Sequence, residues 1–536
     1  MKVSRRAAVA GGAVLATGVA ASIASRREVV GGEDGGPSMA RGHRLRDGKF
    51  PAPTENEQCR IAIVGGGVAG LSAGWMLADA GFNDFRLLEL EDSIGGNARS
   101  GSNAISKFPL GAHYLPVPNR EAKALRYMLE KFGIITATRD GVPVYDPYQL
   151  CADSQERLLW LGRWHEGLMP VIGLSPKDRS DFSAFHEAMA EFGARMGQDG
   201  RPAFAIPLAY SSTDVGLMAL DAISFAAWLD KKGWRSTVLR NYLRYCCRDD
   251  YGCEPGQISA WAGIHYFASR RGWAADGVGE NVLTWPEGNA RLVGQMAKPL
   301  AGKIASGRIV FAVRKSDGGV EVDSFDARRG ISIRTHAKAA VMALPHFVGA
   351  RIAPAAFPSA KAFSYAPWLV ANITLRRLPR GSGAKLAWDN VSATGDSLGY
   401  VVATHQSVAS ATAATVVTWY MPLSRRMPSV ARRELLARSA ADWRQVVEDD
   451  LLRMNPDLKG AIQSIDLWRW GHAMIRPEPG FIWRVAPMAR AAAQSPFFLA
   501  HSDVSGMSLF EEAHYRGTAA AEGAMRLLGH PHESRI

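Results

Sequence analysis

After residue 60, the pattern of hydrophobic and polar residues changes within a short distance from that of a buried strand to that of a helix and back. Ile61–Val64 is a continuous apolar run of strand length, and Gly70–Leu77 repeats its apolar residues with a helical spacing. Phe85–Leu90 is again strand-like. A strand, a helix and a second strand in this order form a β-α-β unit with parallel strands. We therefore predict that the ordered part of the chain begins with an α/β unit.

The rest of the chain divides into one helical stretch and several strand-rich stretches. From Arg120 to about Ser269 the sequence is rich in Trp and Met and lacks strand-like alternation, so it is predicted to be mostly helical. Strands are predicted at 308–313, 320–325, 331–335, 339–343, 371–375, 400–403 and 497–500. A charged helix is predicted over 425–455 and a closing helix over 513–528.

Composition and charge narrow the class of protein. Of the 536 residues, 47% are hydrophobic and 21% are charged, which excludes a mostly disordered, collagen-like or coiled-coil chain. The net charge is +12, but no compact basic run occurs beyond the first part of the chain, so no nucleic-acid partner is expected. The 5 cysteines form no disulfide framework and lack zinc-binding spacing, so no metal site is predicted.

The N-terminal segment resembles a bacterial twin-arginine export signal. Arg5 and Arg6 precede the uncharged stretch Ala7–Ala24, which is too weakly apolar for a spanning helix. The resemblance implies that residues 1–30 are a signal, that the export machinery is a partner, and that the protein is periplasmic. Residues 31–58 are rich in Gly, Pro and charge and are predicted to be a linker.

A glycine-rich turn follows the first strand directly. Gly65, Gly67 and Gly70 have the G-x-G-x-x-G spacing between a strand and a helix, where the backbone can approach a diphosphate at the helix N-terminus. Glu89 ends the second strand about 20 residues later, and an acid there accepts hydrogen bonds from a ribose hydroxyl. Together these residues predict a dinucleotide site.

Further motifs resemble the flavin amine oxidase and phytoene-desaturase-like superfamily. Gly95 and Gly96 form a second glycine pair after the ribose acid, and a Leu-Gly-Ala segment ends at Ala112. The resemblance implies that FAD is the cofactor. It assigns to the FAD contacts the residues Gly95, Gly96, Asn97, Arg99, Gly111, Ala112, Val313, Asp503 and Phe510. Within this set, Val313 holds the adenine, Asp503 holds the ribityl chain, and Phe510 opens a helix that faces the flavin.

The same resemblance implies the fold class. We expect an α/β fold in which an FAD-binding, Rossmann-like domain of the glutathione-reductase type is combined with a discontinuous α+β substrate domain. The FAD-binding domain is predicted at 59–118, 281–350 and 464–536. The substrate domain is predicted to consist of the helical insertion 119–280 and of 351–463, with the substrate between the two domains.

Three residues are catalytic candidates, and two of them have a second interpretation. His113 follows the segment that the family places beside the flavin ring, so it is a candidate for substrate contact. Asp249 lies in a polar segment between apolar helical stretches, where it is a candidate to bind a substrate ammonium or to act as a base. The alternative, which we favour, is that this segment is a helix-ending turn whose acidic side chains are solvated. His472 stands where some family members attach the flavin covalently; otherwise it lines the pocket.

The resemblance implies an FAD-dependent oxidoreductase that removes a hydride from a C–N bond of an amine-like small molecule. Molecular oxygen or another acceptor would then reoxidise the flavin. Because Val370 stands where amine oxidases of the superfamily carry a lysine, and Ala473 and Leu509 replace the aromatic pair, a desaturase, saturase or isomerase of an apolar substrate is the alternative. The non-enzymatic alternative is a flavin-carrying scaffold protein of the cell envelope.

Overall fold

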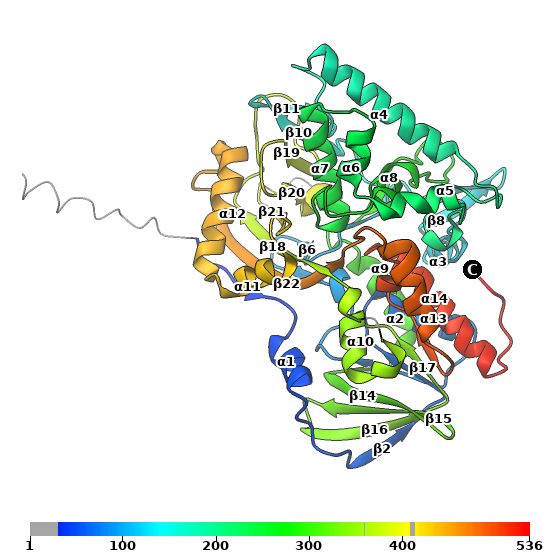
Figure 1. The fold of residues 1–536 in the computed structure, drawn as a ribbon. Helices are drawn as coiled ribbons and strands as arrows, with labels where there is room; N and C mark the ends of the chain where they lie inside the picture. The colour runs from blue at the N-terminus through cyan, green and yellow to red at the C-terminus, as the bar shows by residue number, and fades with distance from the viewer. Residues whose placement is uncertain (1–29, 359, 408–412) are drawn as a thin grey trace, which may run out of the picture.

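The computed structural model describes residues 30–358, 360–407 and 413–536 (Figure 1). Residues 1–29 lie outside this range, and with them nearly all of the predicted export signal. No helix among the described residues is both long and apolar enough to cross a membrane.

A five-stranded parallel sheet carries the predicted β-α-β unit. Its strands, in spatial order, are β13 (Ile304–Ser306), β4 (Phe85–Glu89), β3 (Ile61–Val64), β17 (Ala339–Met342) and β23 (Phe497–Leu499). All four pairings are parallel, and every residue of β3 and β17 is buried, which explains their continuous apolar sequences. The strands come from three distant parts of the chain, so this sheet is discontinuous in sequence.

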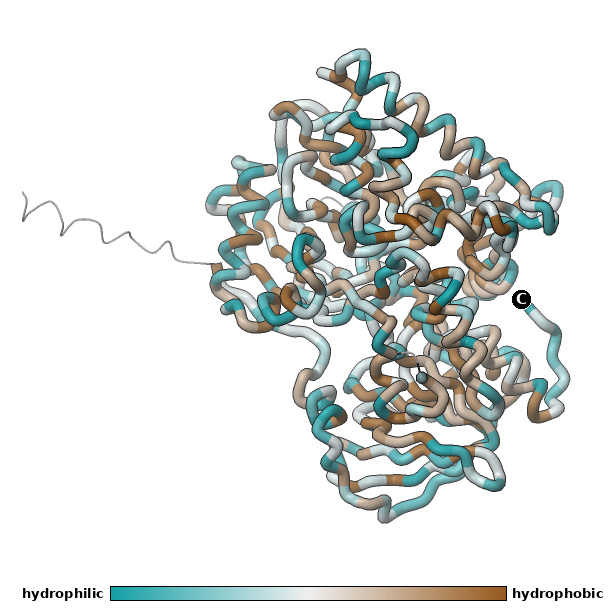
Figure 2. The backbone as a smooth tube through the Cα atoms, viewed as in Figure 1, coloured by the Kyte–Doolittle hydropathy of each residue, from teal (hydrophilic) through white to brown (hydrophobic). Residues whose placement is uncertain are grey.

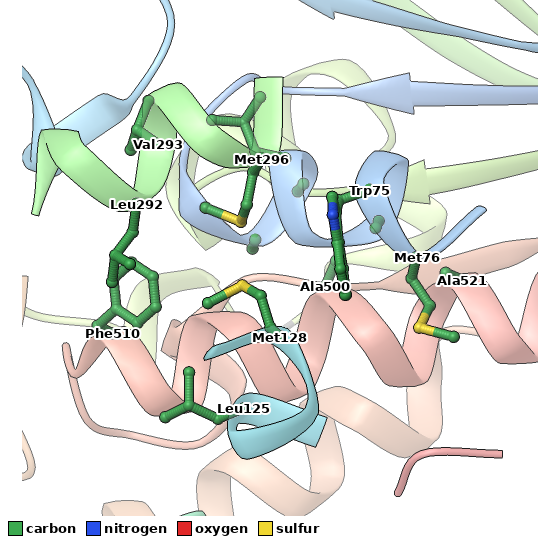
Figure 3. Close-up of a cluster of buried hydrophobic side chains, with 14 of the residues drawn as sticks. Trp75, Met76, Leu125, Met128, Leu292, Val293, Met296, Ala500, Phe510 and Ala521 are labelled. Atoms are coloured by element: carbon green, nitrogen blue, oxygen red, sulfur yellow. The ribbon is translucent and has the colours of Figure 1, made fainter. Parts of the chain in front are cut away.

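Four helices pack around one another beside this sheet. They are α2 (Val68–Asp79), α3 (Lys123–Lys131), α9 (Ala290–Ala297) and the closing helix α14 (Phe510–Leu527). Figure 3 shows Trp75 of α2, Met128 of α3, Met296 of α9 and Ala521 of α14 in one cluster of buried side chains. The first β-α-β unit is thereby joined to the C-terminal helix.

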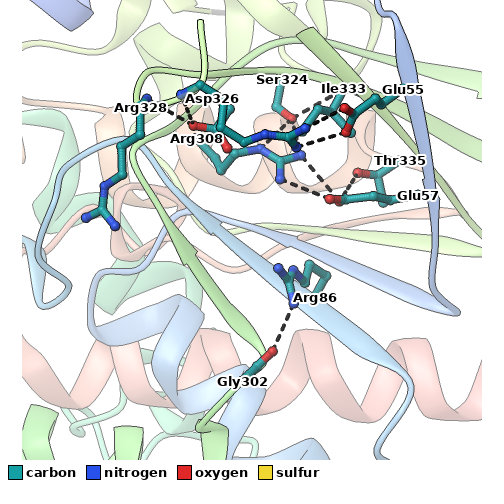
Figure 4. Close-up of polar contacts among 11 residues, drawn as sticks. Glu55, Glu57, Arg86, Gly302, Arg308, Ser324, Asp326, Arg328, Ile333 and Thr335 are labelled. Carbon is teal, nitrogen blue, oxygen red and sulfur yellow. Dashed lines mark hydrogen bonds and ion pairs between the residues drawn. The ribbon is translucent and has the colours of Figure 1, made fainter. Parts of the chain in front are cut away.

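A four-stranded sheet follows in the same half of the molecule. Its strands are β14 (Arg308–Ser316), β15 (Gly319–Asp326), β16 (Ile331–Ala337) and β2 (Glu55–Gln58). The segment 31–58 therefore differs from the predicted linker, because it contains β1 (Asp34–Gly35), α1 (Met39–Asp47) and β2. The strand β2 pairs with β16, and Arg308 forms an ion pair with Glu57 at 3.2 Å (Figure 4). Tertiary pairing thus orders a segment whose composition is typical of a loop.

The other half of the molecule is built on an eight-stranded sheet. Its order is β1, β22 (Ile462–Ile475), β18 (Tyr365–Leu375), β21 (Thr415–Pro422), β20 (Tyr400–Val402), β19 (Asp389–Ser392), β10 (Glu156–Trp160) and β11 (Arg163–Glu166). Alternate residues of β18 face opposite sides: Leu369 lies in the same buried cluster as Trp443 of α12 (Ala440–Met454), whereas Trp368 lies in the cluster that contains Tyr420. One face of the sheet is therefore covered by helices, and the other carries an aromatic cluster.

Two groups of helices belong to this half of the molecule. The predicted charged helix 425–455 is in fact two helices, α11 (Pro428–Ala437) and α12 (Ala440–Met454). The break lies at Ser439, whose hydroxyl caps the second helix by accepting from Asp442 N. The helical insertion contains α4 (Pro176–Ala194), α6 (Phe225–Lys231), α7 (Thr237–Tyr251) and α8 (Ala260–Ala268). Figure 2 shows hydrophilic and hydrophobic residues alternating along α4, at the top of the view.

The stretch from 120 to 269 was predicted to be mostly helical and to lack strand-like alternation, and the second part of this prediction was wrong at the beginning of the stretch. Two hairpins occur there, the first formed by β8 (Ile135–Arg139) and β9 (Val142–Tyr145) and the second by β10 and β11. In the first hairpin Asp140 and Gly141 have φ values of 52° and 79°. Two consecutive positive φ values are typical of the two-residue turn of a tight hairpin. This Asp-Gly pair was the signal in the sequence that we missed.

Candidate functional site

The glycine-rich turn has the geometry of a diphosphate site. Gly65 adopts a φ of +106°, and a Cβ at Gly70 would lie 1.9 Å from the carbonyl oxygen of Gly65, so the turn and the start of α2 are pressed together. Gly67 is the N-cap of α2 and supplies no side-chain hydrogen bond to the helix. The first backbone N–H groups of α2 are therefore available to an anion.

Glu89 lies at the end of β4 beside this turn. Its carboxylate accepts hydrogen bonds from the backbone N–H of Gly66 at 2.6 Å and of Glu91 at 2.8 Å. Burial is the main influence on this carboxyl and raises its pKa above the ordinary value. Its position matches the one predicted for a ribose-binding acid.

A cavity of about 310 Å³ connects the turn, Glu89 and the C-terminal motif; we call it the nucleotide cavity. Nine of the residues predicted to contact the cofactor line it: Gly65, Gly67, Glu89, Gly96, Asn97, Arg99, Ala112, Asp503 and Phe510. The fold thus brings together residues that are separated by more than four hundred positions in the sequence.

Four predicted cofactor residues do not line this cavity. Gly70 and Gly95 shape the adjacent turns, and Gly111 lines the neighbouring cavity described below. Val313 is buried in β14 opposite Val322, whereas Arg308 and Val310 of the same strand line the cavity. The register of β14 shifts between Val310 and Ala312, and the role predicted for Val313 at the adenine stays a prediction.

Asp503 is held by residues that the sequence did not reveal. Its Oδ2 accepts from the hydroxyl of Tyr365 at 2.5 Å and from the backbone N–H of His346 at 2.9 Å. Both partners precede it by well over a hundred residues, so no local pattern connects them. The two contacts fix the carboxylate at the wall of the nucleotide cavity.

His472 also lines the nucleotide cavity rather than the cavity beside it. Its ring stacks on Phe347, with ring centres 4.4 Å apart, and meets the ring of Tyr365 edge-on. Burial lowers the pKa of His472 to about 3, so the imidazole is neutral at pH 7. The role predicted for it in the flavin contact stays a prediction.

A second cavity of about 160 Å³ adjoins the first; we call it the aromatic cavity. The two cavities share seven lining residues, which we call the junction: Asn97, Ala112, Trp470, Ala473, Ser508, Leu509 and Phe510. Ala473 and Leu509, the two positions predicted to lack aromatic side chains, lie in this junction. Outside the junction, the aromatic cavity is lined by the aromatic residues Tyr114, Tyr245, Trp368, Tyr400 and Tyr420.

Asp249 lines the aromatic cavity, on the last turn of α7. Its Oδ2 lies 3.5 Å from the hydroxyl of Tyr114, which donates to it. Burial, followed by the nearby charge of Asp250, raises the pKa of Asp249 to about 7. The predicted helix end is present, since α7 stops at Tyr251 with Gly252 as its left-handed C-cap, but the expectation of solvated acids was wrong because Asp250 is buried and Asp249 faces the cavity.

Three further carboxyl groups line the same cavity. Asp250 forms a two-bond ion pair with Arg270, with both distances 2.7 Å. Burial raises the pKa of Glu511 to about 7, and it raises that of Asp389, which accepts from Tyr245 at 3.4 Å. Arg270 is the one Lys or Arg residue among the described lining residues, so carboxyl groups outnumber fixed cations in this cavity.

His113 lies among the aromatic rings of this cavity. Its imidazole stacks on Tyr420 with ring centres 4.7 Å apart, and burial lowers its pKa to about 4. Two buried polar atoms of the lining, Asn289 Oδ1 and Trp368 Nε1, have no hydrogen-bond partner within the described part of the chain. A neutral imidazole and unpaired polar atoms beside several carboxyl groups are suited to a small, polar, positively charged ligand.

The nucleotide-binding part of the chain matches a known family. Residues 63–132 match the model of the NAD(P)-binding Rossmann-like domain. Polyamine oxidase 6 from Oryza sativa subsp. japonica is 39% identical over 64 residues, which are 12% of this chain and 13% of that relative. The sequence therefore places a dinucleotide-binding domain here, and the chain spans only a small part of this curated relative.

Solved structures similar to this one extend over most of the chain. A triple mutant of putrescine oxidase redesigned in its cofactor binding has a TM-score of 0.65 at 15% identity, covering 88% of this chain and 99% of its own. Cyclohexylamine oxidase from Brevibacterium oxydans IH-35A has a TM-score of 0.63 at 16% identity, with 88% and 99% covered. At this identity the likeness establishes the fold: a mixed α/β architecture with a Rossmann-like nucleotide-binding domain.

Proposed function

We propose that the protein is an FAD-dependent oxidoreductase that removes a hydride from a C–N bond of a small amine. The observation that carries the proposal is the junction, where a carboxyl-rich aromatic cavity opens onto a nucleotide cavity. Similarity in fold to a putrescine oxidase and a cyclohexylamine oxidase supports the substrate class. Molecular oxygen or another acceptor would complete the turnover.

The residues of the nucleotide cavity fit FAD. The open N-terminus of α2 suits a diphosphate, Glu89 suits a ribose hydroxyl, and Asp503 suits the hydroxyls of a ribityl chain. When bound, FAD supplies the acceptor for the hydride, and the protein supplies binding, orientation and electrostatics. Asn97 and Arg99 lie on the same wall, where a guanidinium favours the charge of the diphosphate.

The residues of the aromatic cavity fit an alkylammonium ion. Aromatic faces attract the cation, and ionised Asp249, Asp389 or Glu511 pairs with it. Because the pKa of Asp249 is about 7, its Oδ2 can accept a proton from the ammonium group and leave a neutral amine, the form that releases a hydride. Neutral His113 and the ring of Tyr420 hold the substrate chain away from water.

Two measurements on the purified protein test this proposal. The protein is first loaded with FAD and its visible spectrum recorded before and after denaturation and filtration. It is then mixed anaerobically with putrescine, cyclohexylamine and benzylamine. We expect at least one amine to bleach the flavin band, and oxygen to restore it with formation of hydrogen peroxide. Bound FAD that no amine reduces would contradict the substrate class, and failure to bind FAD would contradict the cofactor.

One observation favours a second function. No lysine occurs among the described lining residues of either cavity, and Val370 lines the aromatic cavity near the junction. A desaturase, saturase or isomerase acting on an apolar substrate needs no such lysine. The alternative would be supported over amine oxidation if the purified protein converted an unsaturated lipid without oxygen uptake and did not oxidise amines.

We also propose that the protein is exported by the twin-arginine route, on the strength of Arg5, Arg6 and the uncharged stretch that follows. This route carries folded proteins, which suits a chain that acquires its cofactor before export. Replacing both arginines by lysine should leave the protein in the cytoplasmic fraction, measured by cell fractionation. An unchanged periplasmic fraction would contradict the proposal.

A further inference from the structure

Residues 31–47 cross from one half of the molecule to the other; we call them the N-terminal strap. In Figure 1 this dark blue segment leaves the edge of the eight-stranded sheet beside β22 and ends in α1, next to β14. The strap precedes the first strand of the β-α-β unit and belongs to neither of the motifs that define the nucleotide cavity. Its contacts nevertheless lead to that cavity.

The first half of the strap is anchored on β22. Asp34 and Gly35 pair in parallel with Leu467 and Trp468. The carboxylate of Asp34 accepts two hydrogen bonds from Arg469, at 3.0 Å and 2.8 Å. A Cβ on Gly35 would lie 2.6 Å from the ring of Trp468, so the backbone approaches the sheet as closely as glycine allows.

The second half of the strap holds the loop that follows Glu89. The backbone N–H of Ser38 donates to Glu91 Oε1 at 2.8 Å. Arg41 donates from Nη1 to the carbonyl oxygen of Leu90 at 2.9 Å and from Nη2 to both carboxylate oxygens of Asp92 at 2.9 Å. The strap therefore binds three consecutive residues next to the ribose acid.

The strap also forms part of the cavity wall. Pro37 and Leu45 line the nucleotide cavity, and Leu45 is 9% exposed and packs in the cluster that includes Val310 and Ile352. On the outer side, the guanidinium of Arg44 lies 3.8 Å from the ring centre of Phe325, which fixes α1 against the four-stranded sheet. An apolar side chain and a proline ring thus close the cavity at the end where Glu89 lies.

We propose that the N-terminal strap is part of the cofactor site: it closes the ribose end of the nucleotide cavity and positions the loop 90–92 behind Glu89. The inference rests on the proposed binding of FAD. Arg41 is a positioning residue in this arrangement, because it touches the loop and not the cofactor. Because Pro37 and Leu45 form part of the cavity wall at this end, we expect the strap chiefly to slow dissociation of the cofactor.

Arg41→Ala tests the positioning role in the full-length apoprotein titrated with FAD. Flavin fluorescence gives the Kd, and dilution into excess riboflavin-binding protein gives the dissociation rate. We expect the Kd to rise roughly ten-fold, mainly through faster dissociation, because a charge-assisted contact to the loop is lost. Arg41→Lys, which keeps one of the contacts to Asp92, should recover part of the affinity.

Arg46→Ala is the matched control. Arg46 lies on the same helix, its side chain is 53% exposed, and it pairs with its neighbour Asp47. It should leave the Kd unchanged and should hardly shift the melting temperature of the apoprotein, because an exposed ion pair contributes little to stability. A loss of affinity in Arg41→Ala without a matching loss of apoprotein stability would separate positioning from folding.

Limited proteolysis gives a second readout that does not depend on activity. Trypsin sites lie within the strap at Arg41, Arg44 and Arg46. Bound FAD should slow cleavage at these sites, and Leu45→Ala should reduce the protection. The strap's role is refuted by the following result. The wild-type protein binds FAD, but bound FAD does not slow cleavage of the strap. In addition, Arg41→Ala and Leu45→Ala bind FAD with the same affinity as Arg46→Ala. If the wild-type protein binds no FAD, the proposed function fails and this inference with it.

Discussion

Asp249 and Asp250 are neighbours on α7 with opposite electrostatic surroundings. Asp250 is neutralised by Arg270, whereas Asp249 accepts a hydrogen bond from the hydroxyl of Tyr114. Burial and the charge of Asp250 outweigh the opposing effects of Arg270 and Tyr114 on Asp249, and they raise its pKa to about 7. One residue of the pair maintains the structure, and the other is available to a ligand.

Asp249→Asn should lower kcat/KM for a reactive amine by about 10- to 100-fold, because it removes a charge that pairs with the ammonium. The sign of the pH dependence follows from the raised pKa. Below pH 7 the carboxyl of Asp249 is neutral, so wild-type kcat/KM should rise with pH through about 7. The measurement is the pH profile of kcat/KM over roughly three decades of proton activity, from about pH 5.5 to about pH 8.5.

Glu511→Gln is the parallel control, because burial also raises the pKa of Glu511 to about 7. Asp249→Asn should remove the part of the rise in kcat/KM near pH 7 that ionisation of Asp249 causes. Glu511→Gln should remove the part that ionisation of Glu511 causes. If Asp249→Asn keeps the wild-type kcat/KM and the wild-type rise of kcat/KM with pH, Asp249 is ruled out as the partner of the ammonium group.

Arg270→Met should destabilise the protein by about 3–5 kcal/mol, because it leaves Asp250 as an unpaired buried charge. The double variant Asp250→Leu/Arg270→Met should recover most of the loss, since neither charge is then buried alone. Urea unfolding followed by tryptophan fluorescence measures both. Arg271→Met is the control: it breaks a half-exposed pair with Glu121 at 3.0 Å and should cost about 1 kcal/mol. Equal costs for Arg270→Met and Arg271→Met would contradict the argument.

At the scale of elements, α14 connects the two cavities and the core. Its first turn carries Phe510 at the junction and Glu511 in the aromatic cavity, while the rest of the helix packs on α2. A Cβ on Gly517 would lie 2.2 Å from the carbonyl oxygen of Ala69, so the two helices approach each other at backbone distance. The position of the junction therefore depends on how closely α14 packs on the nucleotide-binding unit.

Gly517→Ala should destabilise the protein by about 1–3 kcal/mol and weaken FAD binding, because the added methyl group forces α14 away from α2. Gly294→Ala in α9 is the matched control, since nothing lies within 4 Å of a Cβ there. That substitution should stabilise the protein by about 0.5–1 kcal/mol through helix propensity. Melting curves and FAD titration measure both variants. An unchanged stability in Gly517→Ala would mean that the helix can shift without cost.

At the scale of the whole molecule, both cavities take their walls from both halves. The long strand β22 carries Trp470 and Ala473 to the junction, and α7 of the helical insertion carries Asp249 to the aromatic cavity. The nucleotide-binding half contributes Ala112 and Phe510. Neither half contains a complete site, so ligand binding in one cavity is expected to affect a cofactor in the other.

A quaternary ammonium ion cannot lose a proton to become a neutral amine. Such an ion therefore tests whether binding in the aromatic cavity affects the flavin in the nucleotide cavity. Choline should bind to the FAD-loaded protein and perturb the visible flavin band, because the carboxyl groups and aromatic rings of the aromatic cavity attract a quaternary ammonium. Its neutral isostere 3,3-dimethylbutan-1-ol should bind at least about ten-fold more weakly. Anaerobic difference spectra measure both. Equal affinities would mean that charge does not govern binding in this cavity.

Local patterns in the sequence determined the nucleotide-binding unit. The apolar run of β3, the glycines of the turn and Glu89 lie within thirty residues, and strand pairing and helix packing place them together in any fold that forms the unit. The later strands and the closing helix were also predicted, because buried strands and amphipathic helices have periodic sequences. Two hairpins were missed, although Asp140 and Gly141 carried the signal for the first.

Only the tertiary structure decided which distant residues form the site. Asp503 is fixed by Tyr365 and His346, and the strap binds the loop behind Glu89, through contacts that leave no local pattern. The side chain of Asp249 could be exposed or buried on the same helix, and its pKa depends on what the fold packs around it. Burial and long-range pairing are properties of the folded chain, whereas periodicity and turn chemistry are properties of the sequence alone.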